Sequence, residues 1–489
     1  MGIVTNPFLP LNTYIPDGEP HVFDGRVYLF GSHDREAGDS FCLEDYVFWS
    51  APVDDLSDWS NRGPSYSPKQ DPLYDEHDRC SLYAPDVVRG NDGKYYLYYC
   101  LSGYRGAGGY KSPISVAKCD TPDGRYEYLG VVSTKDGKPY LDRVCFDPAL
   151  INDDGVIRLY YGTCYPLEDD LMLNGHRVDP DDVLSRFNPG AKMGAVTVTL
   201  EDDMLTIREE AKTVIPTATM DTSFRGHAFF EGSSIRRING TYYFIYSSVL
   251  NHELCYATSA HPDRDFVFGG TIVSAGDIGI NGRKEKDRLN HTGTTHGSVE
   301  MINGQWYVFY HRLTHGSGYS RQACAEKIVI REDGSIPQVE ITSCGLNDGP
   351  LPCDHTFSAA IACVVTDGHM EHGGNGFAKE KHPVITNEKT EYRIEEITDG
   401  TLIGFRSFAV PPCAALTIEE KGEGEGDYEV RYDLEGSVQA IIHAEASEDN
   451  HILSVRLPEG GGTLPVYLRY CGTGRRMLVS VRIETHSGE

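Results

Sequence analysis

Five copies of one short pattern constrain the fold of this 489-residue chain more than any other feature. Each copy is a strand-like run, an Asp-Gly or Asn-Gly pair, and a second run rich in tyrosine. The turn glycines are Gly25, Gly93, Gly155, Gly240 and Gly304. Asp-Gly and Asn-Gly favour two-residue hairpins, because both central positions of such a turn need a positive φ. The glycines are 62 to 85 residues apart, which leaves room for four strands in each repeat.

A repeated unit of four strands is one blade of a propeller. The pattern therefore predicts an all-β chain in which residues 1–340 form a five-bladed β-propeller. Residues 341–390 contain Gly, Pro and His clusters without the hairpin pattern, and we predict a connecting segment there. Short alternating runs separated by glycines fill residues 391–489, which predicts a β-sandwich. A helix is expected only within the longest interval, around residues 179–187.

A titratable residue precedes each turn glycine by 7 to 9 positions. These residues are Asp17, Asp86, Asp147, Glu231 and His296. Surface charges would scatter without regard to register, so a common offset indicates one structural position repeated in every blade. The first strand of a blade lines the propeller axis, and we therefore expect all five side chains to face one axial pocket. Taken singly, Asp17 could cap a turn before Gly18, and His296 could be a buried core histidine.

Several carboxylates at the end of a channel suit the hydrolysis of a glycosidic bond. One carboxylic acid protonates the leaving oxygen, and one carboxylate activates water or attacks carbon. A third carboxylate keeps the pKa of the acid high by like-charge repulsion. Because the groups come from different blades, the separation of about 6.5–9.5 Å used by inverting enzymes is attainable.

Composition excludes several other classes of function. The chain carries 73 acidic and 44 basic residues, a formal charge of −29, which disfavours binding to nucleic acid. No run approaches the length of a membrane span, and the first residues lack the features of a signal peptide. The 13 cysteines are scattered without metal-site spacing, as expected of small buried side chains in a reducing compartment. We therefore expect a cytoplasmic protein without membrane or nucleic-acid partners.

The sequence resembles glycoside hydrolase family 43 over essentially the whole propeller. The stretches that carry the resemblance are YIPDGEPHVFDGRVYLFGSHD (14–34), YAPDVV (83–88), FDPALINDDG (146–155), FFEGSS (229–234) with RINGTYYFIYSS (237–248), and THGSVEMINGQWYVFYH (295–311). The resemblance implies single-displacement hydrolysis with inversion, mainly of α-L-arabinofuranosides and β-D-xylosides. A small oligosaccharide from plant hemicellulose is then the expected substrate.

The resemblance also implies a role for each matching residue. Asp17 matches the general base, Asp147 the residue that orients the acid and modulates its pKa, and Glu231 the general acid. His296 matches an axial cation or water site, where calcium is the expected ion, and no organic cofactor is expected. Asp86 and Arg321 are expected to bind substrate. Gly18 replaces the proline that commonly follows the base, which leaves Glu19 as an alternative base.

The C-terminal domain resembles family 6 carbohydrate-binding modules in EEITDGTLIGFRSF (395–408) and KGEGEGDYEV (421–430). Such modules are sandwiches that often hold a structural calcium and bind sugar on aromatic platforms. All three tryptophans, Trp49, Trp59 and Trp306, lie in the propeller instead. A domain that only braces the propeller is therefore an equal alternative to a sugar-binding one.

Three alternatives to an exo-acting inverting glycosidase remain open from the sequence. They are an endo-arabinanase-like enzyme, a retaining five-bladed glycosidase, and a non-catalytic carbohydrate-binding propeller. The loops 34–45, 102–112 and 165–192 are expected to shape the pocket and so to select the sugar. Nothing in the sequence indicates the oligomeric state.

Overall fold

The structure is a computed structural model that describes residues 2–78, 80–102, 110–164, 188–373 and 381–486, with the backbone of β11 (Met172–Leu173) and β12 (His176–Arg177). Its helical elements are four 3-10 turns: η1 (Pro68–Gln70), η2 (Ile280–Gly282), η3 (Glu285–Asp287) and η4 (Ala359–Ile361). None of the helices described is long and apolar enough to cross a membrane. The helix predicted around residues 179–187 falls outside the described residues.

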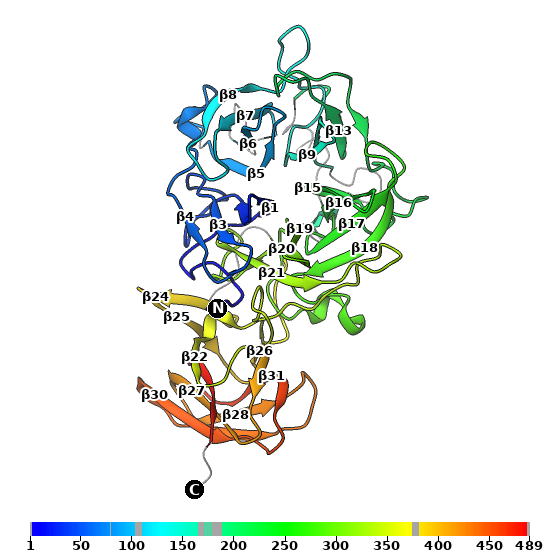
Figure 1. Ribbon diagram of the computed structural model, residues 1–489. Coiled ribbons are helices and arrows are strands. Elements are labelled where there is room, and N and C mark those ends of the chain that lie inside the picture. Colours follow the sequence, from blue (N-terminus) through cyan, green and yellow to red (C-terminus); the bar gives the residue numbers. More distant parts are fainter. Residues whose placement is uncertain are drawn as a thin grey trace.

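Five antiparallel sheets surround a central axis, which confirms the predicted propeller (Figure 1). Blade one consists of β1 (Glu19–Phe23), β2 (Arg26–Phe30), β3 (Trp49–Pro52) and β4 (Ser60–Asn61). Blade two consists of β5 (Leu82–Arg89), β6 (Tyr95–Leu101), β7 (Ile114–Cys119) and β8 (Glu127–Val131). Blade three consists of β9 (Ala149–Asp153), β10 (Val156–Tyr161), β13 (Val196–Thr199) and β14 (Lys212–Thr213).

The last two blades complete the ring. Blade four consists of β15 (Phe229–Ile238), β16 (Thr241–Ser248), β17 (Glu253–Ser259) and β18 (Val267–Ser274). Blade five consists of β19 (Ser298–Ile302), β20 (Gln305–Leu313) and β21 (Arg321–Ile328). Apolar and tyrosine side chains fill the space between neighbouring blades, as Tyr98 of blade two and Leu159 of blade three do in one shared cluster. Burial of these bulky side chains between twisted sheets supplies the main stabilisation of the ring.

The predicted turns form as expected in four of the five hairpins. In blades one, three, four and five, both turn residues have a positive φ, as Asn239 (51°) and Gly240 (83°) do in blade four. In blade two only Gly93 does, because the connection is longer there and Gly90 accepts a hydrogen bond from the Gly93 N–H at 3.0 Å. The hairpin signal therefore located every blade, including the one with a different turn.

The N-terminal segment closes the ring against blade five. The Phe8 N–H donates to the carbonyl of Ala323, a residue of β21, the last strand of that blade, at 3.2 Å. The fully buried Asn6 amide donates to Ala325 O at 2.8 Å and to Glu326 Oε1 at 2.9 Å, and it accepts from the Ala325 N–H at 3.0 Å. The chain start thereby takes the place of a fourth strand in blade five.

The C-terminal part is a sandwich of two antiparallel sheets around one apolar cluster. One sheet has the order β24 (Val384–Glu388), β25 (Glu391–Ile397), β32 (Arg476–Thr485), β27 (Ala414–Gly422) and β30 (Ser447–Arg456), with β22 (His355–Ser358) also paired to β32. The other has the order β23 (Val364–Thr366), β26 (Leu402–Val410), β31 (Gly462–Gly472), β28 (Gly426–Arg431) and β29 (Ala440–Ala444).

The segment 341–390, which we predicted as a connection, contributes strands to both sheets. β22 and β24 belong to one sheet and β23 to the other. The expectation of a mere linker is therefore corrected: the sandwich begins well before residue 391. These strands are only three to five residues long. The partners of β22 and β23 lie far away in the sequence, whereas β24 forms a hairpin with β25.

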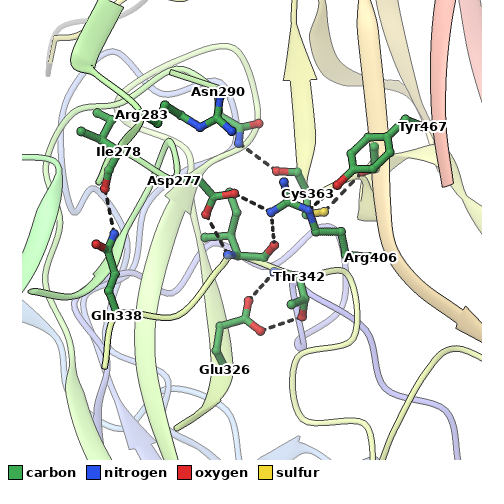
Figure 2. A network of polar contacts seen from close by, with 12 residues as sticks. Asp277, Ile278, Arg283, Asn290, Glu326, Gln338, Thr342, Cys363, Arg406 and Tyr467 are labelled. Atoms are coloured by element: carbon green, nitrogen blue, oxygen red, sulfur yellow. Dashed lines mark hydrogen bonds and ion pairs between the residues drawn. The ribbon is translucent and has the colours of Figure 1, made fainter. Parts of the chain in front are cut away.

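A buried polar network fixes the sandwich to the propeller (Figure 2). Arg406 of β26 pairs with Asp277 of the propeller, and both side chains are buried. Arg406 Nε also donates to the Tyr467 hydroxyl at 2.7 Å. The Ile341 N–H donates to the second Asp277 oxygen at 2.9 Å, so both carboxylate oxygens have partners. An apolar cluster that contains Val308 of the propeller and Tyr467 of the sandwich lies alongside.

Candidate active site

Three of the predicted carboxylates come together at one end of the propeller axis. Asp17 immediately precedes the hairpin of blade one, Asp147 lies just before β9, and Glu231 lies within β15. Asp17 and Asp147 are buried, and both have a positive φ, of 57° and 45°. A non-glycine residue in this conformation is strained, and such strain concentrates at functional sites. The repeated offset thus corresponds to a repeated backbone conformation in blades one and three.

Arg321 fixes the position of Asp17. It is the first residue of β21, and its Nη1 donates to Asp17 Oδ1 at 2.9 Å. The guanidinium also donates twice to the buried Asp34, from Nε at 2.8 Å and from Nη2 at 3.0 Å. These two hydrogen bonds fix the orientation of the guanidinium plane. The remaining nitrogen, Nη1, is thereby directed at Asp17. The guanidinium carbon lies 4.8 Å from the centroid of the Phe41 ring.

His311 holds the backbone of Asp17. Its Nδ1 accepts the Asp17 N–H at 3.2 Å, and its Nε2 lies 2.8 Å from the Thr294 carbonyl, to which it donates. Full burial lowers the pKa of His311 to about 3, while the charge of Asp17 opposes this shift. The imidazole is therefore neutral, with its proton on Nε2.

The surroundings drive the pKa values of Asp17 and Glu231 apart. Burial acts to raise the pKa of Asp17, but the charge of Arg321, with smaller effects of His311 and His296, outweighs it and lowers the pKa. Burial and the negative charge of Asp17 raise the pKa of Glu231 to about 8, against an opposing effect of Arg321. At neutral pH one group is an ionised carboxylate and the other a carboxylic acid. This is the pairing that acid–base catalysis needs.

Asp147 lies between the acid and the His296 ring. Its Oδ2 accepts the N–H of Gly232, the residue after Glu231, at 2.9 Å, and His296 Nδ1 lies 3.8 Å from the same oxygen. Burial raises the pKa of Asp147, and the charges of Glu231 and Asp17 raise it further. Gly232 has a φ of 74°, and a β-carbon there would lie 3.2 Å from the His296 ring. The positive φ and this close approach to the His296 ring both favour glycine at position 232.

Asp86 and Glu19 lie in a separate polar group on the same axis. Asp86 Oδ1 is 2.7 Å from His21 Nε2, and Oδ2 accepts the Leu150 N–H at 2.6 Å. Glu19 accepts from Arg236 Nη1 at 2.6 Å and from the Ser234 hydroxyl at 3.0 Å. These contacts join neighbouring blades. Neither Asp86 nor Glu19 contacts Arg321 or His311 as Asp17 does. Substrate binding by Asp86 stays a prediction.

Two groups of described residues have three potential metal ligands close together. One is Glu19, His21 and Asp86, and the other is His227, Glu253 and Cys255 in blade four. Arg236 occupies the first group as a cation, and His227 Nδ1 pairs with Glu253 at 2.6 Å in the second. His296 belongs to neither group. Of the three loops expected to shape the pocket, most of 102–112 and 165–192 lies outside the described residues. The loop 34–45 is described. It contains Phe41, whose ring lies beside Arg321, and Cys42, whose N–H donates to the Asp34 carboxylate.

Sequence reasoning missed Asp34 and His311. Neither residue belongs to the repeated offset upstream of the turn glycines. In an antiparallel hairpin the end of the second strand lies beside the start of the first. Asp34 follows Gly25 by 9 residues, and His311 follows Gly304 by 7. No repeated downstream offset marks them, because the other three blades have no Asp, Glu or His 7 to 9 residues after the turn glycine.

Comparison with known proteins supports the fold and identifies the family. The chain is 42% identical, over 98% of both chains, to a xylosidase/arabinosidase of Thermoclostridium stercorarium. It is 30% identical to xylosidase/arabinosidase 43A of Humicola insolens, over 66% of this chain and 96% of that protein. A crystal structure of a beta-xylosidase/alpha-arabinofuranosidase from a compost microbial metagenome, in complex with xylotriose and in a calcium-free form, is similar with a TM-score of 0.52. That match has 26% identity and covers 69% of this chain and 98% of the other. Residues 4–336 match the sequence profile of Glycosyl hydrolases family 43, and the chain belongs to that family.

Proposed function

We propose that the protein is an inverting exo-glycosidase that releases terminal β-D-xylose or α-L-arabinofuranose units from hemicellulose oligosaccharides. The observation that carries this proposal is the opposite shift of two pKa values in one cluster of carboxyl groups, downward for Asp17 and upward to about 8 for Glu231. The names of the relatives, xylosidase/arabinosidase, support a pentoside as the substrate.

The proposed reaction is a single displacement at the anomeric carbon. Glu231 donates its proton to the glycosidic oxygen as the bond to carbon breaks. Asp17 takes a proton from a water molecule whose oxygen forms the new bond on the opposite face. Proton exchange with solvent then returns Asp17 to the carboxylate and Glu231 to the acid. Asp147 orients Glu231 through the Gly232 N–H, and Arg321 keeps Asp17 ionised.

His296 is proposed as a neutral polar group behind Asp147. Burial lowers the pKa of its imidazole. Calcium prefers six to eight oxygen ligands. Among the described carboxylates, only Asp147 has an oxygen within 4.0 Å of a His296 ring nitrogen, at 3.8 Å. No group of three potential metal ligands among the described residues includes His296. The side chains thus do not form a calcium cage, and no step of the proposed reaction requires an ion.

A panel of nitrophenyl glycosides combined with NMR of the first sugar released tests the proposal. We expect hydrolysis of the β-D-xyloside or α-L-arabinofuranoside, or both, and release of the opposite anomer. Release of the same anomer would contradict a single displacement. A folded protein that hydrolyses no pentoside would contradict the proposed activity and favour a carbohydrate-binding role.

A further inference from the structure

The strongest unexplained feature near the site is that the sandwich contacts the segment leading into Asp17. Leu11 packs against the apolar core of the sandwich together with Tyr392 of β25. Three residues further along, Tyr14 is buried, and burial together with the neighbouring Glu36 and Tyr392 raises the pKa of its hydroxyl, so the two tyrosine hydroxyls lie close together. Asp17 follows Tyr14 by three residues. The sandwich therefore contacts the chain on the approach to a catalytic carboxylate.

A continuous set of contacts leads from Tyr14 to the Asp17 carboxylate. The Tyr14 carbonyl accepts the Asp34 N–H at 2.9 Å, and the Tyr14 hydroxyl donates to Glu36 Oε1 at 3.5 Å. Tyr14 is thereby bonded to the loop that begins at Asp34. The Asp34 carboxylate in turn holds Arg321 through two hydrogen bonds, and Arg321 Nη1 donates to Asp17.

A second set of contacts reaches the backbone of Asp17. Residues 371–373, which follow β23 of the sandwich, run beside Thr292: the Thr292 N–H donates to Glu371 O at 3.1 Å, and the Gly373 N–H donates to Thr292 O at 2.9 Å. Two residues later, the Thr294 carbonyl accepts from His311, whose Nδ1 accepts the Asp17 N–H. Both the side chain and the backbone of Asp17 are thus supported from the sandwich side.

We infer that the sandwich positions the general base: Tyr392 and Tyr14 act as positioning residues that hold the Asp34–Arg321 pair against Asp17. This inference rests on the proposed function of Asp17. It assigns the C-terminal domain a part in catalysis that does not involve sugar binding. The contact is made by Leu11 and Tyr392, which both pack against the sandwich core, with Tyr14 and its bonds to Asp34 and Glu36 following Leu11 in the chain.

The acidic limb of the pH profile reports this positioning, because Asp17 must be ionised to accept a proton. Arg321 lowers the pKa of Asp17, so a looser Arg321 raises it. The other titratable or charged groups that face Asp17 come from all the elements around it: His311, His296, Asp34, Cys42, Tyr46, Asp147 and Glu231. None of these is changed by a substitution at Tyr392.

The test measures kcat, KM and the pH profile of the full chain with Tyr392→Phe and Tyr392→Ala on a nitrophenyl pentoside. We expect Tyr392→Ala to lower kcat about tenfold, because a slight misplacement of a catalytic group has effects of this size. We expect its acidic limb to move upward by about half a pH unit or more, with KM little changed. Tyr392→Phe keeps the ring and should show a smaller effect in the same direction.

Two controls make the outcome decisive. Tyr467→Phe removes another tyrosine hydroxyl of the sandwich at the same domain interface. The Tyr467 hydroxyl accepts from Arg406 and does not contact Tyr14, so this variant should leave the pH profile unchanged. Arg321→Lys removes the two-pronged contact with Asp34 and should move the acidic limb upward. A shift in Arg321→Lys without any shift in the folded Tyr392 variants would overturn the inference alone. An unchanged limb in Arg321→Lys as well would overturn the assignment of Asp17 as the base.

Discussion

Arg321 determines how charge is divided among the buried carboxylates of the site. It neutralises Asp17, whose pKa it lowers against the effect of burial, and it is itself held by Asp34. Glu231 lacks such a contact with a cation strong enough to outweigh burial, and its pKa rises to about 8. The type of residue alone could not have assigned acid and base. The assignment depends on which carboxylate the single arginine touches.

The first residue-scale prediction separates the acid from the base by chemistry. A leaving group that is already a stable anion needs little protonation, so Glu231→Ala should retain much of its activity on a dinitrophenyl pentoside. On a natural disaccharide its activity should fall further, by about 10²-fold or more. Steady-state rates on both substrates provide the measurement. Asp17→Ala is the control, because water must be activated whichever group leaves. Equal losses on both substrates in both variants would rule out this division of roles.

The second residue-scale prediction concerns the basic limb of the pH profile. Glu231 acts only when protonated, so activity should fall as the pH rises through about 8, the raised pKa of Glu231. The negative charge of Glu231 raises the pKa of Asp147. By the same repulsion, a charge on Asp147 would raise the pKa of Glu231. Asp147→Asn should therefore move the basic limb to lower pH and also lower the maximal rate.

Asp153→Asn is the matched control for that experiment. Asp153 is the last residue of β9, the strand that follows Asp147, and its carboxylate pairs with Arg158 and Arg237. Its substitution should reduce stability and leave the basic limb in place. A basic limb that does not move in Asp147→Asn would show that Asp147 has no electrostatic effect on the acid.

At the scale of elements, the sequence predicted the blades well because a hairpin is a local structure. Asn239 and Gly240 adopt the positive φ that their turn needs, and the tyrosine-rich strand that follows is buried between blades. The strands β22 and β23 were missed for the opposite reason, because their partners are distant in the sequence. The three residues Val364–Thr366 have no local pattern, and they are strands only because they pair with β26 about forty residues later.

The ring closure allows a prediction at the scale of elements. Asn6 is fully buried, and its amide bonds to Ala325 and Glu326 of blade five. Asn6→Ala leaves the N–H and the carbonyl of Ala325 without their Asn6 partner, at a cost of about 1–3 kcal/mol for each unsatisfied buried group. Glu326 keeps its hydrogen bonds from Tyr310 and Thr342. We expect a lower urea midpoint, with kcat of the folded enzyme little changed. Asn387→Ala removes an exposed amide in the sandwich and should have almost no effect. Equal midpoints in the two variants would contradict a closing role for Asn6.

At the scale of the whole molecule, the two domains are expected to unfold together. The apolar cluster that contains Val308 and Tyr467 is shared between them, and the buried Arg406–Asp277 pair crosses the same interface (Figure 2). Few sequence features indicate this interface, because its residues come from four separate stretches of the chain. A single cooperative transition in calorimetry is the expected result for the unchanged protein.

Arg406→Ala should uncouple the domains. It leaves the buried Asp277 carboxylate without its charged partner, and breaking a buried ion pair in this way costs about 3–5 kcal/mol. Because that cost falls on the interface and both domain cores stay intact, we expect the single transition to separate into two, one for each domain. Arg393→Ala is the matched control: Arg393 is also buried and paired, but only with Glu388, Glu391 and Glu395 of its own sheet. Its loss should lower the melting temperature without dividing the transition. A single transition in Arg406→Ala, displaced no further than in Arg393→Ala, would show that the ion pair does not couple the domains.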